Sequence, residues 1–243
     1  WRFPALLSGW PFEPRLHEGV RRALERPGGL VIVNAPDEDR RRALAYALLA
    51  ELDPGLNKIL TLERHAFRRV PEWTQVEEGD LPVADPDHAL ELLLKQRPDG
   101  LLLEGPADWA LPTALPAVLQ GMRVILDMPY VDAADVLLHL RSLDLPPPLL
   151  DRTVRMVISV ASLPGLCPEC RRPVEEDEEG DPGYESTGCA ACDMTGESGE
   201  VLVPGLFAPD TGSLRRILRE ADGSSLLTMI GRRGEPTIRR AAR

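Results

Sequence analysis

Long apolar runs, aromatic residues and export signals are scarce in this chain of 243 residues. Aromatic side chains make up 5% of it, whereas charged side chains make up 28%. No apolar stretch approaches the roughly 18 residues that a helix needs to cross a bilayer, and no signal peptide opens the sequence. We therefore expect a soluble, cytoplasmic protein. Because the chain begins at Trp1 rather than at Met, we also expect that a segment precedes it.

Basic residues are too few to favour nucleic acid as a partner. Lysine and arginine number 28 against 39 acidic residues, which gives a net charge of −11. Such a charge repels a phosphate backbone. The arginines are scattered, apart from the run Arg40–Arg42 and a few near the end of the sequence. The charge therefore disfavours a zinc-ribbon protein that binds nucleic acid, which cysteine pairs could otherwise indicate.

Cysteine occurs at only four positions, and their spacing is the clearest signal in the chain. Two pairs, each with two residues between its cysteines, are separated by a turn-rich connector. Four thiolates placed in this way can surround one tetrahedral zinc ion and form a closed structural site. The alternatives are a pair of disulfides, which a reducing compartment disfavours, and an iron–sulfur cluster, for which nothing nearby indicates redox chemistry. The predicted zinc ligands are Cys167, Cys170, Cys189 and Cys192.

Strands alternate with helices along the rest of the chain, which predicts a mainly parallel α/β sheet with right-handed crossovers. The run Leu30–Val33 is typical of a strand covered on both faces. The acidic run Glu175–Asp181 indicates a solvated loop. The predicted strands are Leu30–Val33, Lys58–Leu62, Gly100–Leu103, Arg123–Leu126, Arg155–Val160 and Val201–Phe207. The predicted helices are Pro11–Glu25, Asp37–Leu52, Asp87–Lys95, Asp132–Leu143 and Ser213–Glu220.

Several short segments stand in a consistent order and spacing: Leu44–Leu49, Ile59–Glu63, Pro98–Leu103, the stretch from Gly121 and the two cysteine pairs. Together they resemble segments of the type II secretion and type IV pilus assembly ATPases. The segment Leu44–Leu49 is similar to the Thr-Leu-Tyr-Ala-Leu-Leu that follows the phosphate-binding loop of that family. Ile59–Glu63 resembles its aspartate box, Pro98–Leu103 its Walker B strand, and the stretch from Gly121 its histidine box. The two cysteine pairs resemble its tetracysteine subdomain. The resemblance implies a RecA-like, P-loop-type core with a small zinc-binding subdomain.

The same resemblance implies a domain organisation and partners. We expect a RecA-like core at residues 1–160, a tetracysteine subdomain at 161–206, and a C-terminal helix with a basic tail at 207–243. Members of the family form hexamers on the cytoplasmic face of an inner-membrane platform. The implied partners are therefore proteins of a secretion or pilus assembly machine, in a hexamer or in a mixed ring with an active ATPase. Membrane association would be indirect, through those partners.

The phosphate-binding loop of that family is replaced in this chain. Such a loop has the form G-x-x-x-x-G-K-[ST], in which glycines admit backbone N–H groups to the phosphates, the lysine reaches them and the hydroxyl holds magnesium. Both glycines are absent here, Arg41 takes the place of the lysine, and Arg42 that of the hydroxyl. Acidic residues occupy the helix start, where the helix dipole favours negative charge. The corresponding residues are Ala35, Pro36, Asp37, Glu38, Asp39, Arg40, Arg41 and Arg42.

Two interpretations of this segment are open. In the first, the three arginines bind phosphate in another geometry. In the second, the segment is a helix turn with solvated ends, which accounts for both the acidic residues and the loss of glycine. We favour the second interpretation.

The acidic positions of the family are altered as well. Its Walker B strand ends in Gly-Glu, whereas this chain has Glu104 followed by Gly105, which turns the carboxylate to the opposite face of a strand. In the aspartate box Glu63 matches, but Arg64 replaces an acid. We interpret Glu63 and Glu104 as remnants of a nucleotide site.

The histidine box and the segment after the cysteines also differ from the family. Met122 and Pro129 stand where the family has histidines, and Gly199–Leu202 replaces a Gly-Arg-Thr-Gly-like segment. We expect the histidines that are present to be surface or capping residues, because no nucleophile or metal ligand accompanies them in sequence. They are His17, His65, His88 and His139.

Together these losses predict a catalytically inactive homologue, a pseudo-ATPase. We expect no catalytic residues and neither ATP nor magnesium as a cofactor, because the groups that stabilise the transition state are absent. Such a protein would act as a scaffold, regulator or assembly subunit. The alternative is a divergent ATPase that uses Arg41 with Glu63 or Glu104 to hydrolyse ATP and drive pilus assembly or protein secretion.

Overall fold

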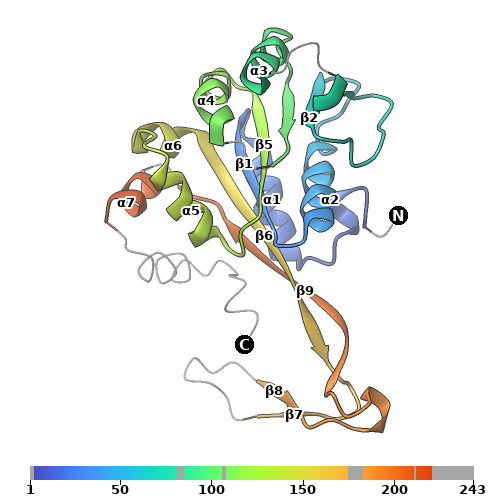
Figure 1. Cartoon of the computed structure of the whole chain (residues 1–243). Coiled ribbons are helices and arrows are strands. Elements are labelled where there is room, and N and C mark those ends of the chain that lie inside the picture. Colours follow the sequence, from blue (N-terminus) through green and yellow to red (C-terminus); the bar gives the residue numbers. More distant parts are fainter. Residues whose placement is uncertain (1–2, 81–84, 106–107, 175–182, 211, 221–243) are drawn as a thin grey trace.

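A computed structural model of the chain describes residues 3–80, 85–105, 108–174, 183–210 and 212–220 (Figure 1). The predicted acidic loop Glu175–Asp181 and the tail after Glu220 lie outside the described residues. Within the described ranges, no helix combines the length and the apolar character that crossing a membrane requires.

The centre of the molecule is a seven-stranded sheet in the order β3-β2-β4-β5-β1-β6-β9. All neighbouring strands are parallel except β6 and β9, which are antiparallel. The predicted mainly parallel α/β fold is therefore confirmed. The strands are β1 (Gly29–Asn34), β2 (Ile59–Glu63), β3 (Thr74–Glu77), β4 (Gly100–Leu103), β5 (Arg123–Met128), β6 (Val154–Leu166) and β9 (Glu197–Phe207).

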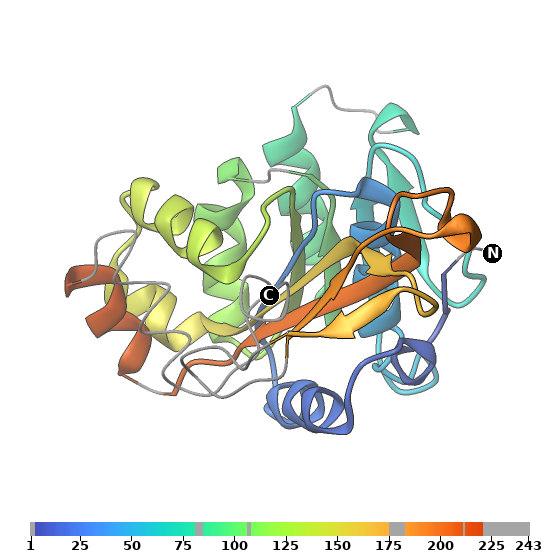
Figure 2. The same cartoon turned by 90° about the horizontal axis from the view of Figure 1, so that it is seen from below.

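Helices cover both faces of this sheet (Figure 2). Alternate residues of β1 pack on opposite sides: Val31 and Val33 contact the α1 and α2 side, whereas Leu30 and Ile32 face α3 to α7. The helices are α1 (Pro14–Glu25), α2 (Glu38–Leu49), α3 (Pro86–Lys95), α4 (Leu111–Leu119), α5 (Ala133–Ser142), α6 (Pro147–Thr153) and α7 (Ser213–Glu220). Short 3-10 turns lie at Leu7–Gly9, Glu78–Asp80, Asp108–Ala110 and Ala190–Cys192.

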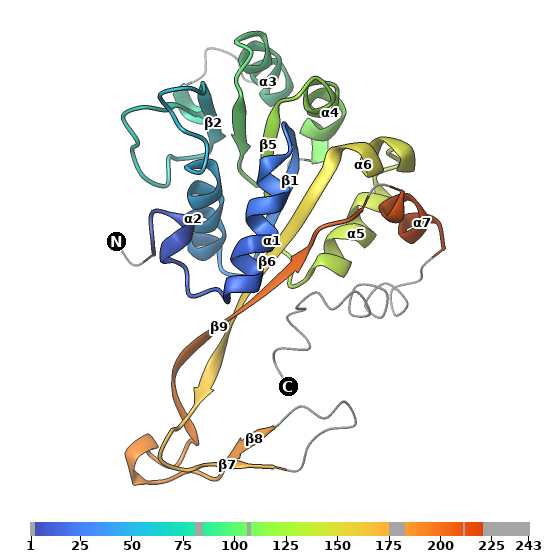
Figure 3. The same ribbon diagram turned by 180° about the vertical axis from the view of Figure 1, so that it is seen from behind.

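Strands β6 and β9 continue past the helices as a long antiparallel hairpin (Figures 1 and 3). At its far end lies a two-stranded sheet of β7 (Arg171–Pro173) and β8 (Tyr184–Ser186). We refer to the described residues 161–174 and 183–206 as the arm. The predicted boundary between residues 160 and 161 falls inside β6, so one continuous strand joins the arm to the sheet.

Three elements of the sheet and its helical layers were not predicted, and each has a local reason. Strand β3 lies at the edge of the sheet and lacks an apolar run. Helix α4 contains Pro112 and Pro116, residues that usually end helices. The run Pro146–Pro148 indicated only the end of the preceding helix, but proline also fits a first helical turn, where its missing N–H has no partner to lose, and α6 begins at Pro147.

Candidate functional site

The segment that replaces the phosphate-binding loop connects β1 to α2. Asp37 caps α2, and its side chain accepts a hydrogen bond of 2.7 Å from the backbone N–H of Arg40. The predicted helix turn is thus present. The expectation that its ends are solvated is wrong for two of its arginines. Arg40 and Arg41 are only 5% and 6% exposed. Their guanidinium groups turn into the protein, where other parts of the chain supply carboxylates.

Arg41 forms a buried ion pair with Asp127 at the end of β5. The Nε of Arg41 lies 2.9 Å from Oδ2 of Asp127, whose side chain is 1% exposed. A second Arg41 nitrogen donates to the carbonyl of Ala35 at 2.8 Å, and the N–H of Gly105 donates to the other Asp127 oxygen. Arg41 stands where the family has the lysine of its phosphate-binding loop, and its charge is therefore neutralised inside the protein.

Arg42 lies between the two acidic residues interpreted as remnants. One of its nitrogens is 3.5 Å from a carboxylate oxygen of Glu63 and 3.5 Å from one of Glu104. Glu63 also accepts hydrogen bonds from the Tyr46 hydroxyl at 2.6 and 2.7 Å. Burial, together with these bonds to Glu63, raises the pKa of Tyr46. Glu63 and Glu104 belong to different segments of the sequence, and the structure brings both carboxylates to Arg42.

Glu104 is held by a second arginine as well. Its side chain is 3% exposed, and it accepts hydrogen bonds from the Arg64 backbone N–H at 2.8 Å and from the Arg64 guanidinium at 3.2 Å. Burial raises the pKa of Glu104, and the charge of Arg42 opposes that shift. Arg64 also pairs with Glu38 at 2.8 Å. Arg64, which replaces an acid in the aspartate box, thus joins the same network of ion pairs as Arg42.

Arg40 reaches a different partner, Glu200 in β9. The two side chains are 2.8 Å apart, with Arg40 almost fully buried and Glu200 half exposed. The Ser162 hydroxyl on β6 donates to the same Glu200 oxygen, and the ring of Phe3 lies 5.8 Å from the Arg40 guanidinium carbon. This contact ties the start of α2 to the base of the arm.

The space between these groups is small. A hollow lined by Arg42, Tyr46, Glu63, Glu104 and Asp127, with Ala45 and Leu102, leaves no room for a water molecule. The carboxylates therefore fill the space around the arginines.

Asp127 is not among the predicted site residues, although the sequence contains a signal for its ion pair. In β5, Ile125 faces α2, and Asp127 is two residues further along the same face. A single acid on a buried strand face opposite a helix with arginines indicates an ion pair. Of the histidines, His65 borders this network, because its backbone carbonyl accepts a hydrogen bond from the Arg42 guanidinium. His17 lies in α1, His88 in α3 and His139 in α5.

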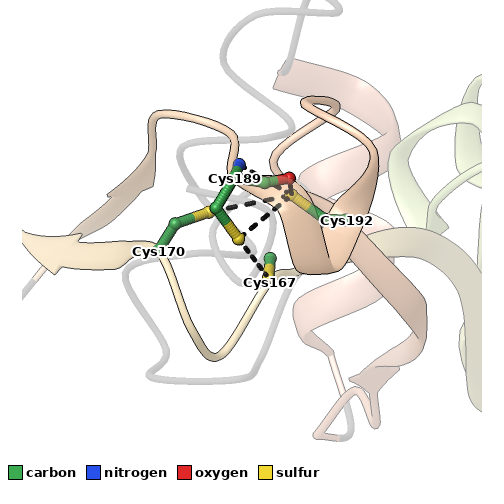
Figure 4. Close-up of side chains that lie close together, drawn as sticks. All are labelled: Cys167, Cys170, Cys189 and Cys192. Atoms are coloured by element: carbon green, nitrogen blue, oxygen red, sulfur yellow. Dashed lines mark hydrogen bonds between the residues drawn. The ribbon is translucent and has the colours of Figure 1, made fainter.

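The four predicted metal ligands lie together at the far end of the arm (Figure 4). Their sulfur atoms are all within 4.8 Å of one another, and three of the separations are 3.8 to 3.9 Å. Zinc–sulfur bonds of about 2.3 Å in a tetrahedron place sulfurs about 3.8 Å apart. All four cysteines are free thiols. The arrangement therefore fits a tetrahedral metal ion and differs from a pair of disulfides.

Backbone groups prepare one of these sulfurs to be a ligand. The N–H groups of Cys189 and Gly196 each lie 3.2 Å from the sulfur of Cys192. These bonds lower the pKa of the Cys192 thiol, which favours the thiolate that binds metal. Gly196 has φ +77°, and a Cβ there would lie 2.5 Å from the Ser186 hydroxyl. Glycine thus allows the tight turn that delivers its N–H to sulfur.

A parallel sheet with helices on both faces, a strand-to-helix loop at its centre and a four-cysteine arm define an ATPase-like α/β protein. The family model described as type II/IV secretion system protein matches residues 6–243. The chain belongs to this family, which confirms the resemblance seen in its motifs.

Curated relatives agree with this assignment. The type II secretion system protein HxcR of Pseudomonas aeruginosa is 30% identical over 224 residues, covering 90% of this chain and 43% of that protein. The type II secretion system ATPase E of Vibrio cholerae is 26% identical, covering 92% and 46%. This chain thus spans less than half the length of these curated relatives.

Two solved structures share the fold. The ATPase DotB of Legionella pneumophila gives a TM-score of 0.67 at 16% identity, covering 99% of this chain and 61% of that one. The pilus retraction motor PilT with bound ADP gives 0.65 at 17% identity, covering 95% and 60%.

The buried pair of Arg41 and Asp127 makes a sharp prediction about stability. Changing Asp127→Ala leaves a buried guanidinium without its counter-charge, and we expect unfolding free energy to fall by about 3–5 kcal/mol. The double change Arg41→Met with Asp127→Leu removes both charges, so we expect a much smaller loss. Urea unfolding measures both. The exposed residue Glu91, in the middle of α3, provides the control, because Glu91→Ala should change stability by less than about 0.5 kcal/mol. An equally small effect of Asp127→Ala would contradict the ion pair.

The contact between Arg40 and Glu200 predicts measurable coupling between α2 and the arm. We expect a double-mutant cycle of Arg40→Ala and Glu200→Ala to give a coupling energy of about 1 kcal/mol, because Arg40 is buried. The exposed pair of Glu18 and Arg22 on α1, at 3.0 Å, should couple by only about 0.3 kcal/mol. Additive losses at Arg40 and Glu200 would show that the pair carries no energy.

Proposed function

We propose that this domain is a catalytically inactive member of its family that acts through protein contacts. The observation that carries the proposal is the charge arrangement at the start of α2. Each of the three arginines there is paired with a carboxylate from another element of the chain. Positive groups that would bind phosphate are thus occupied by the protein itself.

Electrostatics support the exclusion of nucleotide. A phosphate brought within about 4 Å of one of these carboxylates would meet roughly 4 kcal/mol of repulsion at an effective dielectric near 20. The hollow beside Arg42 has no space for a water molecule, so a phosphate would also have to displace side chains. Each carboxylate displaced in this way would lose its arginine partner while still buried, which adds a further cost.

The proposal includes a structural zinc ion at the four cysteines. A closed site with four thiolates leaves no open position for a substrate, so the metal would organise the tip of the arm. The two-stranded sheet of β7 and β8 is too small to be stable alone. The metal would supply the missing stabilisation by joining the start of β7, after Cys170, and the end of β8, before Cys189, to the hairpin.

We further propose that the protein acts in the cytoplasm, within a secretion or pilus assembly machine. Its relatives include a type II secretion ATPase and the type IV pilus assembly ATPase PilB of Myxococcus xanthus. A place in a hexamer, or in a mixed ring with an active ATPase, would let it contribute contacts without hydrolysis. Any association with the inner membrane would then run through those partners.

Calorimetry with magnesium-ATP tests the inactive site. We expect no heat of binding at micromolar protein and millimolar nucleotide, and no release of phosphate in a sensitive turnover assay, because the arginine charges are already neutralised. Binding with a micromolar Kd would contradict the proposal. Magnesium-dependent turnover that disappears in folded Arg41→Gln and Glu104→Gln variants would establish the divergent ATPase instead.

Metal analysis tests the proposed zinc site. We expect one zinc ion per chain as purified, measured by mass spectrometry of the metal. The variants Cys170→Ser and Cys192→Ser should lose most of it, whereas Thr187→Ser, an exposed change two residues from Cys189, should retain it. Acidification should release zinc, because protons compete for the thiolates. A chain that folds with an intact arm but holds no metal would overturn this part of the proposal.

A further inference from the structure

The guanidinium group of Arg42 lies among oxygen atoms from three places in the chain, which we call the oxygen cage. A single nitrogen of this group, Nη2, is 3.5 Å from an oxygen of Glu63 and 3.5 Å from an oxygen of Glu104. The same nitrogen donates a hydrogen bond to the backbone carbonyl of His65, and the centre of the Phe67 ring is 5.3 Å from the guanidinium carbon. Carboxylate and carbonyl oxygens are the ligands that magnesium, calcium and manganese prefer.

The two carboxylates of the cage depend on a cation at this point. The side chains of Glu63 and Glu104 are 1% and 3% exposed, and a buried carboxylate is strongly disfavoured unless it is paired. Burial raises the pKa of Glu104, and the charge of Arg42 opposes that shift more than any other group does. Glu63 otherwise accepts hydrogen bonds from neutral groups such as the Tyr46 hydroxyl. The second arginine at Glu104, Arg64, is mostly exposed to water, where its charge is screened.

The side chain of Arg42 leaves a metal ion no space in the cage. The hollow that Arg42 lines with both glutamates does not hold even a water molecule. A divalent ion would in addition be repelled by the guanidinium charge. The oxygen atoms therefore suit a small cation, but a positive group of the chain itself already fills their centre.

We propose that the Arg42 guanidinium takes the place of a divalent cation in this cage. Glu63, Glu104 and the carbonyl of His65 then form a latent site for magnesium or manganese. A small neutral side chain at position 42 would vacate the cage and leave two buried negative charges there. A divalent ion bound by two carboxylates keeps several waters, which would fill the rest of the vacated space. The inference rests on the proposed function only in taking the site to be free of nucleotide.

Titration with manganese tests the latent site on the full, zinc-loaded chain without nucleotide. Electron paramagnetic resonance measures the free ion, at about 0.1 M salt to screen the exposed acids. We expect Arg42→Ser to bind one manganese ion at least about tenfold more tightly than the unaltered chain, because the two carboxylates then need a new counter-charge. Arg64→Ser is the matched control. It removes the other arginine at Glu104 but leaves Arg42 in the cage, so manganese binding should stay within about twofold of the unaltered chain.

Further changes in the Arg42→Ser chain locate the ion. Glu63→Gln or Glu104→Gln should each remove the gain in manganese binding, because an amide carries no charge. Glu91→Gln, at an exposed position in α3, should leave the gain unchanged. Zinc content is measured alongside, since thiolates favour zinc and the carboxylates favour manganese.

A second set of variants tests the role of the charge even where Arg42→Ser fails to fold. The triple change Arg42→Met, Glu63→Gln and Glu104→Gln removes the cation together with both anions. We expect it to melt at least about 4 °C above Arg42→Met alone, because the single change leaves two buried carboxylates without their partner. Added manganese should raise the melting temperature of Arg42→Met and leave that of the triple variant unchanged.

Each outcome decides the inference. Folded Arg42→Ser that binds manganese no more tightly than the unaltered chain, or a gain that survives both glutamine changes, would overturn it. So would a triple variant no more stable than Arg42→Met. The ATP calorimetry on the unaltered chain is a separate readout. Binding of magnesium-ATP there removes the proposed inactivity, whereas the manganese titration without nucleotide still decides the role of Arg42.

Discussion

The need to neutralise buried positive charge organises the centre of this structure. A guanidinium group that leaves water without a counter-charge costs several kcal/mol, and α2 buries the side chains of consecutive arginines in its first turn. Their partners come from separate elements, with Asp127 on β5, Glu63 on β2 and Glu200 on β9. The start of one helix is thereby joined to strands on both sides of β1.

The same physical demand explains how a phosphate-binding loop can be replaced without loss of the fold. A helix N-terminus and nearby cations favour an anion, whatever its source. In this chain Asp37 caps the helix, and carboxylates from the sheet approach the arginines. Because these anions are covalently part of the chain, they lose less entropy on binding than a free nucleotide would. The loop is thereby held by contacts within the chain.

The fold was largely predictable where local sequence determines structure. The buried run Leu30–Val33 predicts β1, and the spacing of the cysteines predicts their cluster, because each depends on residues close together in the chain. Strand β3 and the proline-containing α4 were not predictable in this way, since their stability comes from packing on neighbours. Likewise, the pairing of Arg41 with Asp127 spans 86 residues and depends on strand order.

The two sites are connected by a single pair of strands, and this connection gives the altered loop a role of its own. Glu200 lies on β9 where the hairpin leaves the sheet, and Arg40 holds it at the start of α2. In a nucleotide-dependent protein, a contact between loop and arm would change with the ligand, because binding shifts an equilibrium only through such differential contacts. Here both partners belong to the chain, so the contact does not depend on a ligand and favours one position of the base of the arm. The proposed role in protein contacts agrees with an arm whose base is held by the chain itself.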